Sequence, residues 1–234
     1  GKELEGHSLG NLFIGALTDI TGSFELAVRE AGNILTIRGR VVPVTLEKIT
    51  LSAVLKNKKN INGQSRISNI GKPIDRVFMH PAHPLPSSES IEAIKKARLV
   101  VLGPGSLYTS VIPNLLVKNI ALEIKRSRAK VVYVCNIMTQ PGETRKYSAA
   151  DHLEAISKHV GINIVDYVIV NSRPIPKELI NKYRKKLSAP VKIDETRISK
   201  LGVKVVKADV FSVEKGLVRH DPEKLAKAII RLTA

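Results

Sequence analysis

Tryptophan is absent from this sequence, and only one cysteine, Cys135, occurs in its 234 residues. A lone cysteine cannot form an internal disulfide, which fits a reducing compartment such as the cytoplasm. Long apolar runs are also missing: stretches such as 99–102 and 131–134 fall far short of the roughly 18–20 residues that a membrane-spanning helix needs. The first residues resemble neither a secretory signal nor a transit peptide. We therefore expect a cytoplasmic protein without a membrane span.

Acidic residues are scarce relative to basic ones. The chain has 21 Asp and Glu against 38 Lys and Arg, which gives a formal net charge of +17. Such a field attracts anions, so a phosphate-bearing ligand and a nucleic acid are both candidate partners. Aromatic residues make up only 4% of the chain, and a surface that stacks on nucleic-acid bases normally needs more of them. Nucleic-acid binding is therefore the less favoured of the two.

The second half of the chain alternates between short apolar runs and helical patterns. Strands are expected at 98–102, 130–136, 167–171 and 203–208, and helices at 87–97, 113–127, 148–160, 177–186 and 222–232. Strands that are continuously apolar, each followed by a helix, are typical of a parallel sheet covered on both sides. The pattern predicts an α/β, Rossmann-like fold with a mainly parallel sheet and helices on both faces.

The first half of the chain does not show this alternation of apolar runs and helical patterns. Apolar spacing predicts a helix over 11–24, which Ser8 or Asn11 could cap. Residues 34–80 are expected to form a small antiparallel or mixed β region, because 36–44 and 50–55 are rich in β-branched residues and 58–63 carries turn signals. We expect one domain over 1–234, with 34–80 as a β-rich subregion within it.

The loop after the first strand of the alternation is the strongest local signal. Gly103 and Gly105 would let the backbone approach a ligand, and the start of the next helix favours an anion. Ser106, Tyr108 and Thr109 add hydroxyl groups. The stretch matches neither a dinucleotide-binding glycine pattern nor a P-loop. A tight strand-to-helix turn with capping serines remains the alternative to a phosphate site.

Two later stretches carry polar groups that could face the same ligand. Asn136, Thr139 and Gln140 follow the second strand and offer more hydrogen-bonding groups than a simple turn requires. Arg219 precedes a helix that Asp221 can cap, where it would either contact a ligand phosphate or pair with a carboxylate. Tyr183 would either stack on a ring or pack within the protein.

Asp151 and His152 are best explained by surface polarity or capping. No cluster has the ligand spacing of a zinc site, and we predict no metal ligand.

The stretch "GHSLG" at 6–10 has the spacing of a serine-hydrolase nucleophile elbow. Such an elbow needs a buried strand immediately before the serine, and Lys2-Glu3-Leu4-Glu5 is too polar to form one. We therefore predict no catalytic residue in this sequence, and assign Ser8 to the polar start of a helix.

Three phrases together resemble one family. "GHSLGNL", "VVLGPGSLYTSVIPNLLV" with "VCNIMTQPGET", and "GLVRHDPEKLA" occur in an order similar to that of the gluconeogenesis factor family, whose fold is related to 2-phospho-L-lactate transferase. The resemblance implies a cytoplasmic regulatory protein that binds a UDP-sugar, such as UDP-N-acetylglucosamine, and controls carbon flux, cell-wall synthesis and cell shape during gluconeogenic growth. It also implies the ligand-binding residues, which are His7, Ser8, Asn11, Gly103, Gly105, Ser106, Tyr108, Thr109, Asn136, Thr139, Gln140, Tyr183 and Arg219.

The sequence also departs from that family. A strand with a Gly-Gly-Gly-Thr-Gly loop and an Asp-Asp-Gly-Gly segment, which the family carries at its start, do not occur here, so we expect the chain to begin inside the domain. A phospholactyl-type transferase is the alternative function, and Mg²⁺ would be a cofactor only in that case. We expect a nucleotide-sugar ligand, and leave open a homodimer and a cell-wall enzyme as protein partners.

Overall fold

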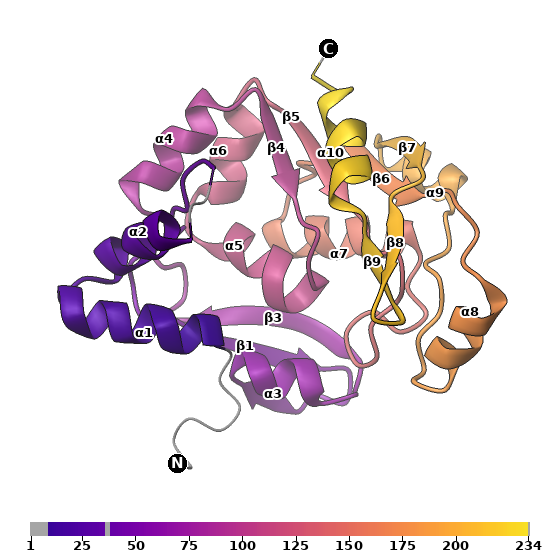
Figure 1. Ribbon diagram of the computed structural model, residues 1–234, viewed down its shortest axis with the longest axis horizontal. Helices are drawn as coiled ribbons and strands as arrows, with labels where there is room; N and C mark the ends of the chain where they lie inside the picture. The colour runs from indigo at the N-terminus through magenta and orange to yellow at the C-terminus, as the bar shows by residue number, and fades with distance from the viewer. Residues whose placement is uncertain (1–8, 36–37, 234) are drawn as a thin grey trace.

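The computed structural model describes residues 9–35 and 38–233. Its centre is a parallel sheet in the order β4-β5-β6-β7 (Figure 1). These strands are β4 (Leu99–Leu102), β5 (Lys130–Val134), β6 (Tyr167–Asn171) and β7 (Lys204–Ala208). All three pairings are parallel, with Val100 opposite Val131 and Val168 opposite Val205. The four strands predicted from apolar runs are confirmed to within two residues at each end.

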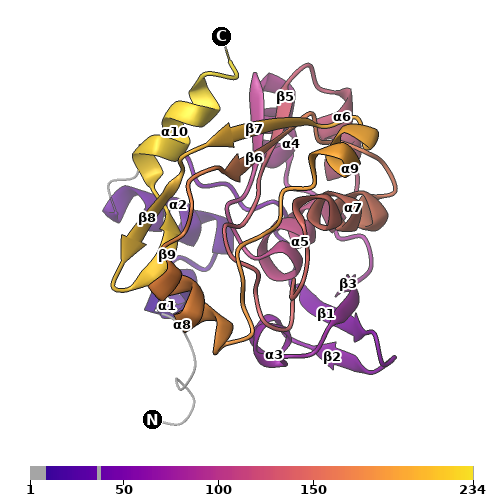
Figure 2. The same ribbon diagram turned by 90° about the vertical axis from the view of Figure 1, so that its right-hand side faces the viewer.

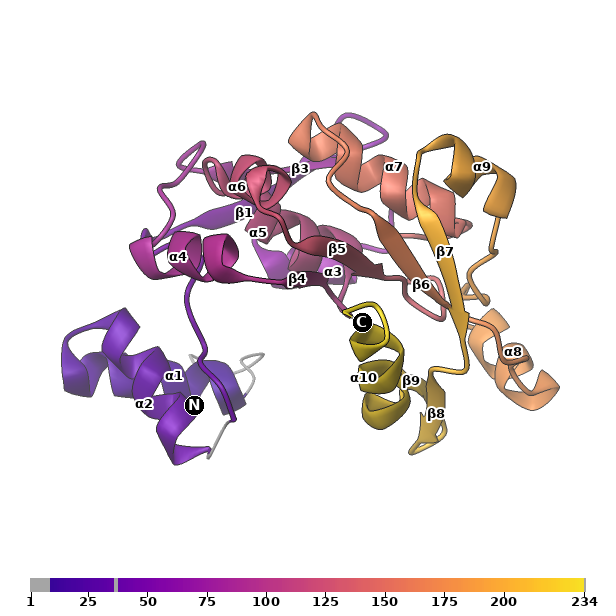
Figure 3. The ribbon, with the colours of Figure 1, turned by 90° about the horizontal axis from the view of Figure 1, so that it is seen from above.

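Helices cover both faces of this sheet, as predicted (Figure 3). Right-handed connections between successive parallel strands place the intervening helices on one face. Those helices include α6 (Ile120–Arg126), α7 (Ala149–Val160) and α9 (Glu195–Lys200), and α4 (Ser88–Lys96) packs beside α6. The opposite face is covered by α10 (Pro222–Ile230), where Leu225 packs in one core with Val132, Val134 and Ile169.

Local capping rules explain where the predicted helices begin. Ser87 accepts a hydrogen bond from the Ser90 amide at the start of α4, and Asp221 accepts from two amides at the start of α10. Ser148 and Asp151 form a capping box at the start of α7.

A separate antiparallel sheet lies beneath the helical layer, in the order β2-β1-β3 (Figure 2). It consists of β1 (Thr50–Leu55), β2 (Asn60–Asn62) and β3 (Ile74–His80), with α3 (Gln64–Asn69) between the last two. The predicted β region is thus confirmed as antiparallel, but only from residue 50 onward. The β region was expected to begin at residue 34, and this is wrong for residues 38–49, which form no strand. The carbonyls of Pro43 and Val44 bond to Ser87 at the start of α4 instead of to a neighbouring strand.

The N-terminal segment forms two helices where the sequence predicted one. α1 (Leu9–Thr21) ends at Gly22, whose φ is +68°, and Ser23 caps α2 (Phe24–Ile34) by accepting from the Leu26 amide. The prediction of a helix over 11–24 is confirmed for α1, and α2 was missed.

The single helix expected at 113–127 is wrong. The chain forms a π-helical turn η2 (Leu107–Val111), then α5 (Ile112–Leu116), and restarts as α6. Val117 is extended and Asn119 has a φ of 62°, so no continuous helix can pass through 117–119.

The remaining elements are α8 (Lys177–Arg184) and the hairpin of β8 (Phe211–Glu214) and β9 (Leu217–His220). In the part of the chain that the structure describes, no helix has the length and apolar character needed to cross a membrane.

Candidate functional site

A cleft of about 430 Å³ opens beyond the carboxyl ends of β4 and β5. Its walls come from the loop after β4, the loop after β5, the end of α8 with the residues that follow it, and β9. In open α/β sheets this edge is where ligands bind. The cleft brings together seven of the residues predicted to bind a ligand, which are Gly105, Ser106, Asn136, Thr139, Gln140, Tyr183 and Arg219.

The loop 103–105 forms part of one wall of the cleft, and only one of its two glycines lines the cleft itself. Gly103 has a φ of +89°, and a Cβ there would lie 3.3 Å from the carbonyl oxygen of Val134, so it allows β4 to leave the sheet close against β5. A Cβ on Gly105 would lie 3.1 Å from the Cβ of Ser110. Gly103 is therefore behind the cleft, whereas Gly105 borders it.

Side-chain amides connect the two loops. Asn136 donates from Nδ2 to Oε1 of Gln140 over 3.2 Å, and Gln140 donates from Nε2 to Oγ of Ser106 over 2.7 Å. The Gln140 backbone is fixed in turn, because its amide donates to Oγ1 of Thr144 over 2.9 Å. The chain of bonds ends at the Ser106 hydroxyl, whose own proton has no acceptor among the described residues and is available to a ligand.

Thr139 lines the cleft but uses its polar groups within the protein. Its hydroxyl accepts from the Ala189 amide over 3.0 Å, its amide donates to the Ala189 carbonyl over 2.8 Å, and its carbonyl accepts from the Ser188 hydroxyl. Thr139 thus fastens the loop after β5 to the segment that follows α8.

The opposite wall carries positive charge and one neutral histidine. The Tyr183 hydroxyl accepts from the Val218 amide over 2.9 Å, which joins α8 to β9 (Figure 2). Arg219 and Lys186 are exposed and form no ion pair within residues 9–35 and 38–233. The alternative prediction, that Arg219 pairs with a carboxylate, finds no partner in that part of the chain.

His220 and Lys186 line the cleft although sequence reasoning missed both. His220 donates from Nε2 to the Cys135 carbonyl over 3.3 Å, and burial lowers the pKa of its ring. The ring is therefore neutral at pH 7 and leaves Nδ1 as an acceptor. A signal existed, since His220 directly follows Arg219 and Lys186 ends the basic run 184–186.

Tyr108 and Thr109 do not line the cleft. The buried carboxylate of Glu143 accepts from the Tyr108 amide over 3.1 Å and from the Thr109 hydroxyl over 2.9 Å. Burial raises the pKa of Glu143, and these two hydrogen bonds partly offset the rise. Tyr108 instead borders a second cavity under α7. A ligand-binding role for either residue stays a prediction.

Three further predicted residues cannot be placed in the cleft. His7 and Ser8 lie outside the described residues, and so does the side chain of Asn11, whose backbone belongs to α1. The roles predicted for them also stay predictions.

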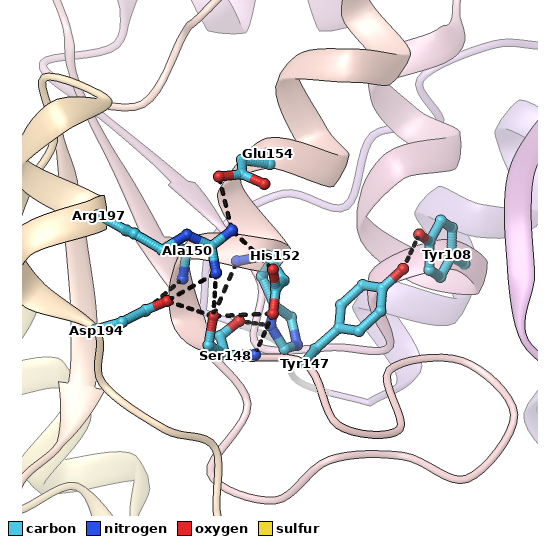
Figure 4. Close-up of polar contacts among 9 residues, drawn as sticks. Tyr108, Tyr147, Ser148, Ala150, His152, Glu154, Asp194 and Arg197 are labelled. Atoms are coloured by element: carbon cyan, nitrogen blue, oxygen red, sulfur yellow. Dashed lines mark hydrogen bonds and ion pairs between the residues drawn. The ribbon is translucent and has the colours of Figure 1, made fainter.

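Asp151 and His152 have structural partners. The predicted capping role is confirmed for Asp151, but His152 is fully buried rather than on the surface and donates from Nδ1 to the Ser148 carbonyl over 2.8 Å (Figure 4). Across the described part of the chain, no group of three or more His, Cys, Asp or Glu residues could hold a metal ion.

Comparison with known proteins places these features in context. The family model of "2-phospho-L-lactate transferase CofD" matches residues 1–211. The chain is 41% identical over 232 residues to a Bacillus subtilis (strain 168) protein named Gluconeogenesis factor, covering 99% of this chain and 73% of that protein. It is 43% identical over 231 residues to a Clostridium acetobutylicum relative with a similar name, covering 97% of this chain and about half (51%) of that relative. A crystal structure of a Bacillus halodurans protein superposes with a TM-score of 0.91 at 43% identity, covering 98% of this chain and 74% of that one.

Proposed function

This chain belongs to the 2-phospho-L-lactate transferase CofD family, and from that premise we propose that it is a regulatory protein that binds a UDP-sugar. The observation that carries the proposal is the convergence of Gly105, the Asn136–Gln140–Ser106 hydrogen bonds and Arg219 on one cleft. UDP-N-acetylglucosamine is the ligand we expect. The volume of about 430 Å³ lies within the usual range of small-molecule sites, roughly 300–1,000 Å³.

In this proposal, each wall recognises a different part of the ligand. Arg219 and Lys186 neutralise the diphosphate, which a planar guanidinium can bind with two hydrogen bonds. The Ser106 hydroxyl donates its remaining proton to a phosphate oxygen. The amide groups of Asn136 and Gln140 hydrogen-bond to the sugar or the base, and the free Nδ1 of His220 accepts from a hydroxyl.

Calorimetric titration of the protein with UDP-N-acetylglucosamine tests this proposal. We expect saturable binding that Arg219→Gln weakens about tenfold or more, since losing a charge-assisted contact costs roughly 1.5–3 kcal/mol. Arg128→Gln is a matched control, because Arg128 is also exposed and lies just before β5, at the amino ends of the parallel strands. No heat from a folded sample, or equal weakening by both variants, would contradict the proposal.

We further propose that ligand binding controls carbon flux and cell-wall synthesis during gluconeogenic growth. The name of the relatives, gluconeogenesis factor, supports the role in carbon flux. A strain that lacks the protein should grow poorly on gluconeogenic carbon sources and lose its normal shape there. Wild type and Arg128→Gln should restore growth, and Arg219→Gln should not. Restoration by Arg219→Gln would show that the role in growth does not depend on ligand binding in the cleft.

Phospholactyl transfer is the second candidate function, because the matching family model carries that description. The described residues do not supply a cluster suited to Mg²⁺, and we derive no step through a metal ion. Incubating the protein with a deazaflavin acceptor, an activated nucleotide donor and Mg²⁺ distinguishes the two functions. A coupled product would establish a transferase, and ligand binding without turnover would favour the regulatory protein.

A further inference from the structure

A second cavity, of about 680 Å³, lies under α7 and shares no lining residue with the cleft. Its walls come from α7, the turn after β1, the segment that leads into β3, and the loop between β5 and α7. Two of these segments touch directly: a Cβ on Gly142 would lie 2.9 Å from the backbone of Gly71. The loop and the antiparallel sheet are therefore held together at one end of the cavity.

The carboxylates of this cavity already have partners. Asp75 pairs with Lys158 over 3.4 Å. Arg197 reaches in from α9 and binds Asp151 over 2.9 Å and Glu154 over 2.8 Å (Figure 4). Glu143, as described above, accepts from the turn η2. Each lining carboxylate thus has a hydrogen-bond or ion-pair partner within the protein, and the single guanidinium of Arg197 also serves Asp194, over 3.1 Å.

The remaining cations are not compensated. Lys56, Arg145 and Lys146 line the cavity and form no ion pair with any residue that the structure describes. They come from different walls, Lys56 from the end of β1 and the other two from the loop before α7. Lys146 has a φ of +66°, a conformation that suits glycine better than a residue with a Cβ.

A hydroxyl donor lines the same cavity as these cations. The hydroxyls of Tyr108 and Tyr147 lie 2.7 Å apart (Figure 4), so one donates to the other and a single O–H proton is left over. Burial raises the pKa of Tyr108, which keeps this phenol protonated. His159 offers nothing further, because Nδ1 donates to the Ala155 carbonyl and Nε2 accepts from the Val77 amide.

We propose that this cavity is a second ligand site, for a small metabolite with two separated phosphate groups, such as a sugar bisphosphate. One phosphate contacts Arg145 and Lys146, the other contacts Lys56, and the free phenol proton binds a phosphate or sugar oxygen between them. The volume of the cavity exceeds that of the cleft and accommodates a ligand of this size. The site is independent of the proposed UDP-sugar site.

Calorimetry with fructose 1,6-bisphosphate as the probe and fructose as the uncharged control tests the proposal. We expect saturable binding of the bisphosphate alone, weakened about tenfold or more by Lys56→Gln and by Lys146→Gly. Lys146→Gly should have a Tm at or above that of the wild type, because glycine relieves the positive φ. Its weaker binding could then not be attributed to a damaged fold.

Two controls locate the effect. Lys227→Gln removes an exposed charge from α10, away from both cavities, and Arg219→Gln removes one from the cleft. Both should bind the probe as the wild type does. The proposal is overturned if the bisphosphate does not bind saturably, if Lys227→Gln weakens binding equally, or if Arg219→Gln abolishes it. UDP-N-acetylglucosamine, titrated separately, reports on the cleft whatever the probe does.

Discussion

The cleft beyond β4 and β5 and the cavity under α7 lie on two sides of the same loop, residues 135–147, yet their polar groups are arranged differently. In the cleft, neutral amides and hydroxyls bond to one another from Asn136 to Ser106. In the cavity, three carboxylates pair with Arg197 and Lys158, and Lys56, Arg145 and Lys146 form no ion pair with the described part of the chain. The cleft is suited to recognition by the direction of hydrogen bonds, and the cavity to recognition by charge, which salt screens more strongly.

Glu143 lines the cavity and holds the turn η2, which follows the glycine loop of the cleft. Glu143→Ala would leave the Tyr108 amide and the Thr109 hydroxyl buried without an acceptor, so we expect a loss of about 3 kcal/mol in the free energy of unfolding. Glu143→Gln retains one acceptor oxygen and should cost less than half as much. Urea denaturation measures both; equal stability of the Ala variant and the wild type would show that the carboxylate does not hold the turn η2.

Two glycines, one next to the cavity and one behind the cleft, allow the backbone packing of the two regions to be compared. Gly142, next to the cavity, has a φ of +86° and would place a Cβ 2.9 Å from Gly71 backbone atoms, whereas Gly103, behind the cleft, has a nearest contact of 3.3 Å. Gly142→Ala should therefore cost about 2–3 kcal/mol and Gly103→Ala about 1–2 kcal/mol. Thermal unfolding ranks them, with Gly202→Ala, which has a positive φ but open space, as the control for backbone strain alone. The reverse ranking would mean that the close approach of Gly71 and Gly142 is not maintained in solution.

The parallel sheet could be predicted from sequence because its signals are local. Strands such as 131–134 are buried on both sides and therefore continuously apolar, and Ser87, Ser148 and Asp221 mark helix starts by their own hydrogen bonds. The prediction of β structure for residues 38–49 failed because the contacts that decide the structure there are not local. The β-branched residues of 38–44 indicate a strand, but the backbone there bonds to Ser87 about 45 residues away.

The residues of the candidate site also divide into those with a local sequence signal and those without one. Gly105, Ser106, Asn136 and Gln140 could be predicted because each follows a recognisable strand, and strand ends meet at one edge of the sheet. Tyr108 belongs to the same phrase, yet the turn η2 directs it to the other side of the loop. The convergence of Lys56 with Arg145 and Lys146 has no sequence signal, because about 90 residues separate them and the packing of the antiparallel sheet against the helical layer brings them together.

Acidification should lower the free energy of unfolding, and the share of each histidine in that loss is the smallest effect predicted here. Burial lowers the pKa of His159 at the cavity, of His220 at the cleft and of His152 beneath α7, each below the ordinary value of 6.5. The unfolded chain then binds protons at a higher pH than the folded one, so stability is complete above about pH 6.5 and is lost as the pH falls below it, by up to roughly 1.4 kcal/mol per pH unit for each histidine. His152 should contribute most, since its Nε2 is buried and has no hydrogen-bond partner among the described residues.

Urea unfolding at pH 7.5 and 5.5 measures this loss, and single variants assign it. His159→Gln removes the buried ring at the cavity and His220→Gln the one at the cleft, so each should reduce the loss of stability on acidification. His80→Gln, which replaces an exposed ring, should leave that loss unchanged. Because every variant has the same large positive charge, general repulsion at low pH cancels in these differences. If His80→Gln reduces the loss as much as the other two, the acid sensitivity arises from overall charge and not from the buried rings. If His159→Gln alone reduces it, the acid sensitivity arises at the cavity and not at the cleft.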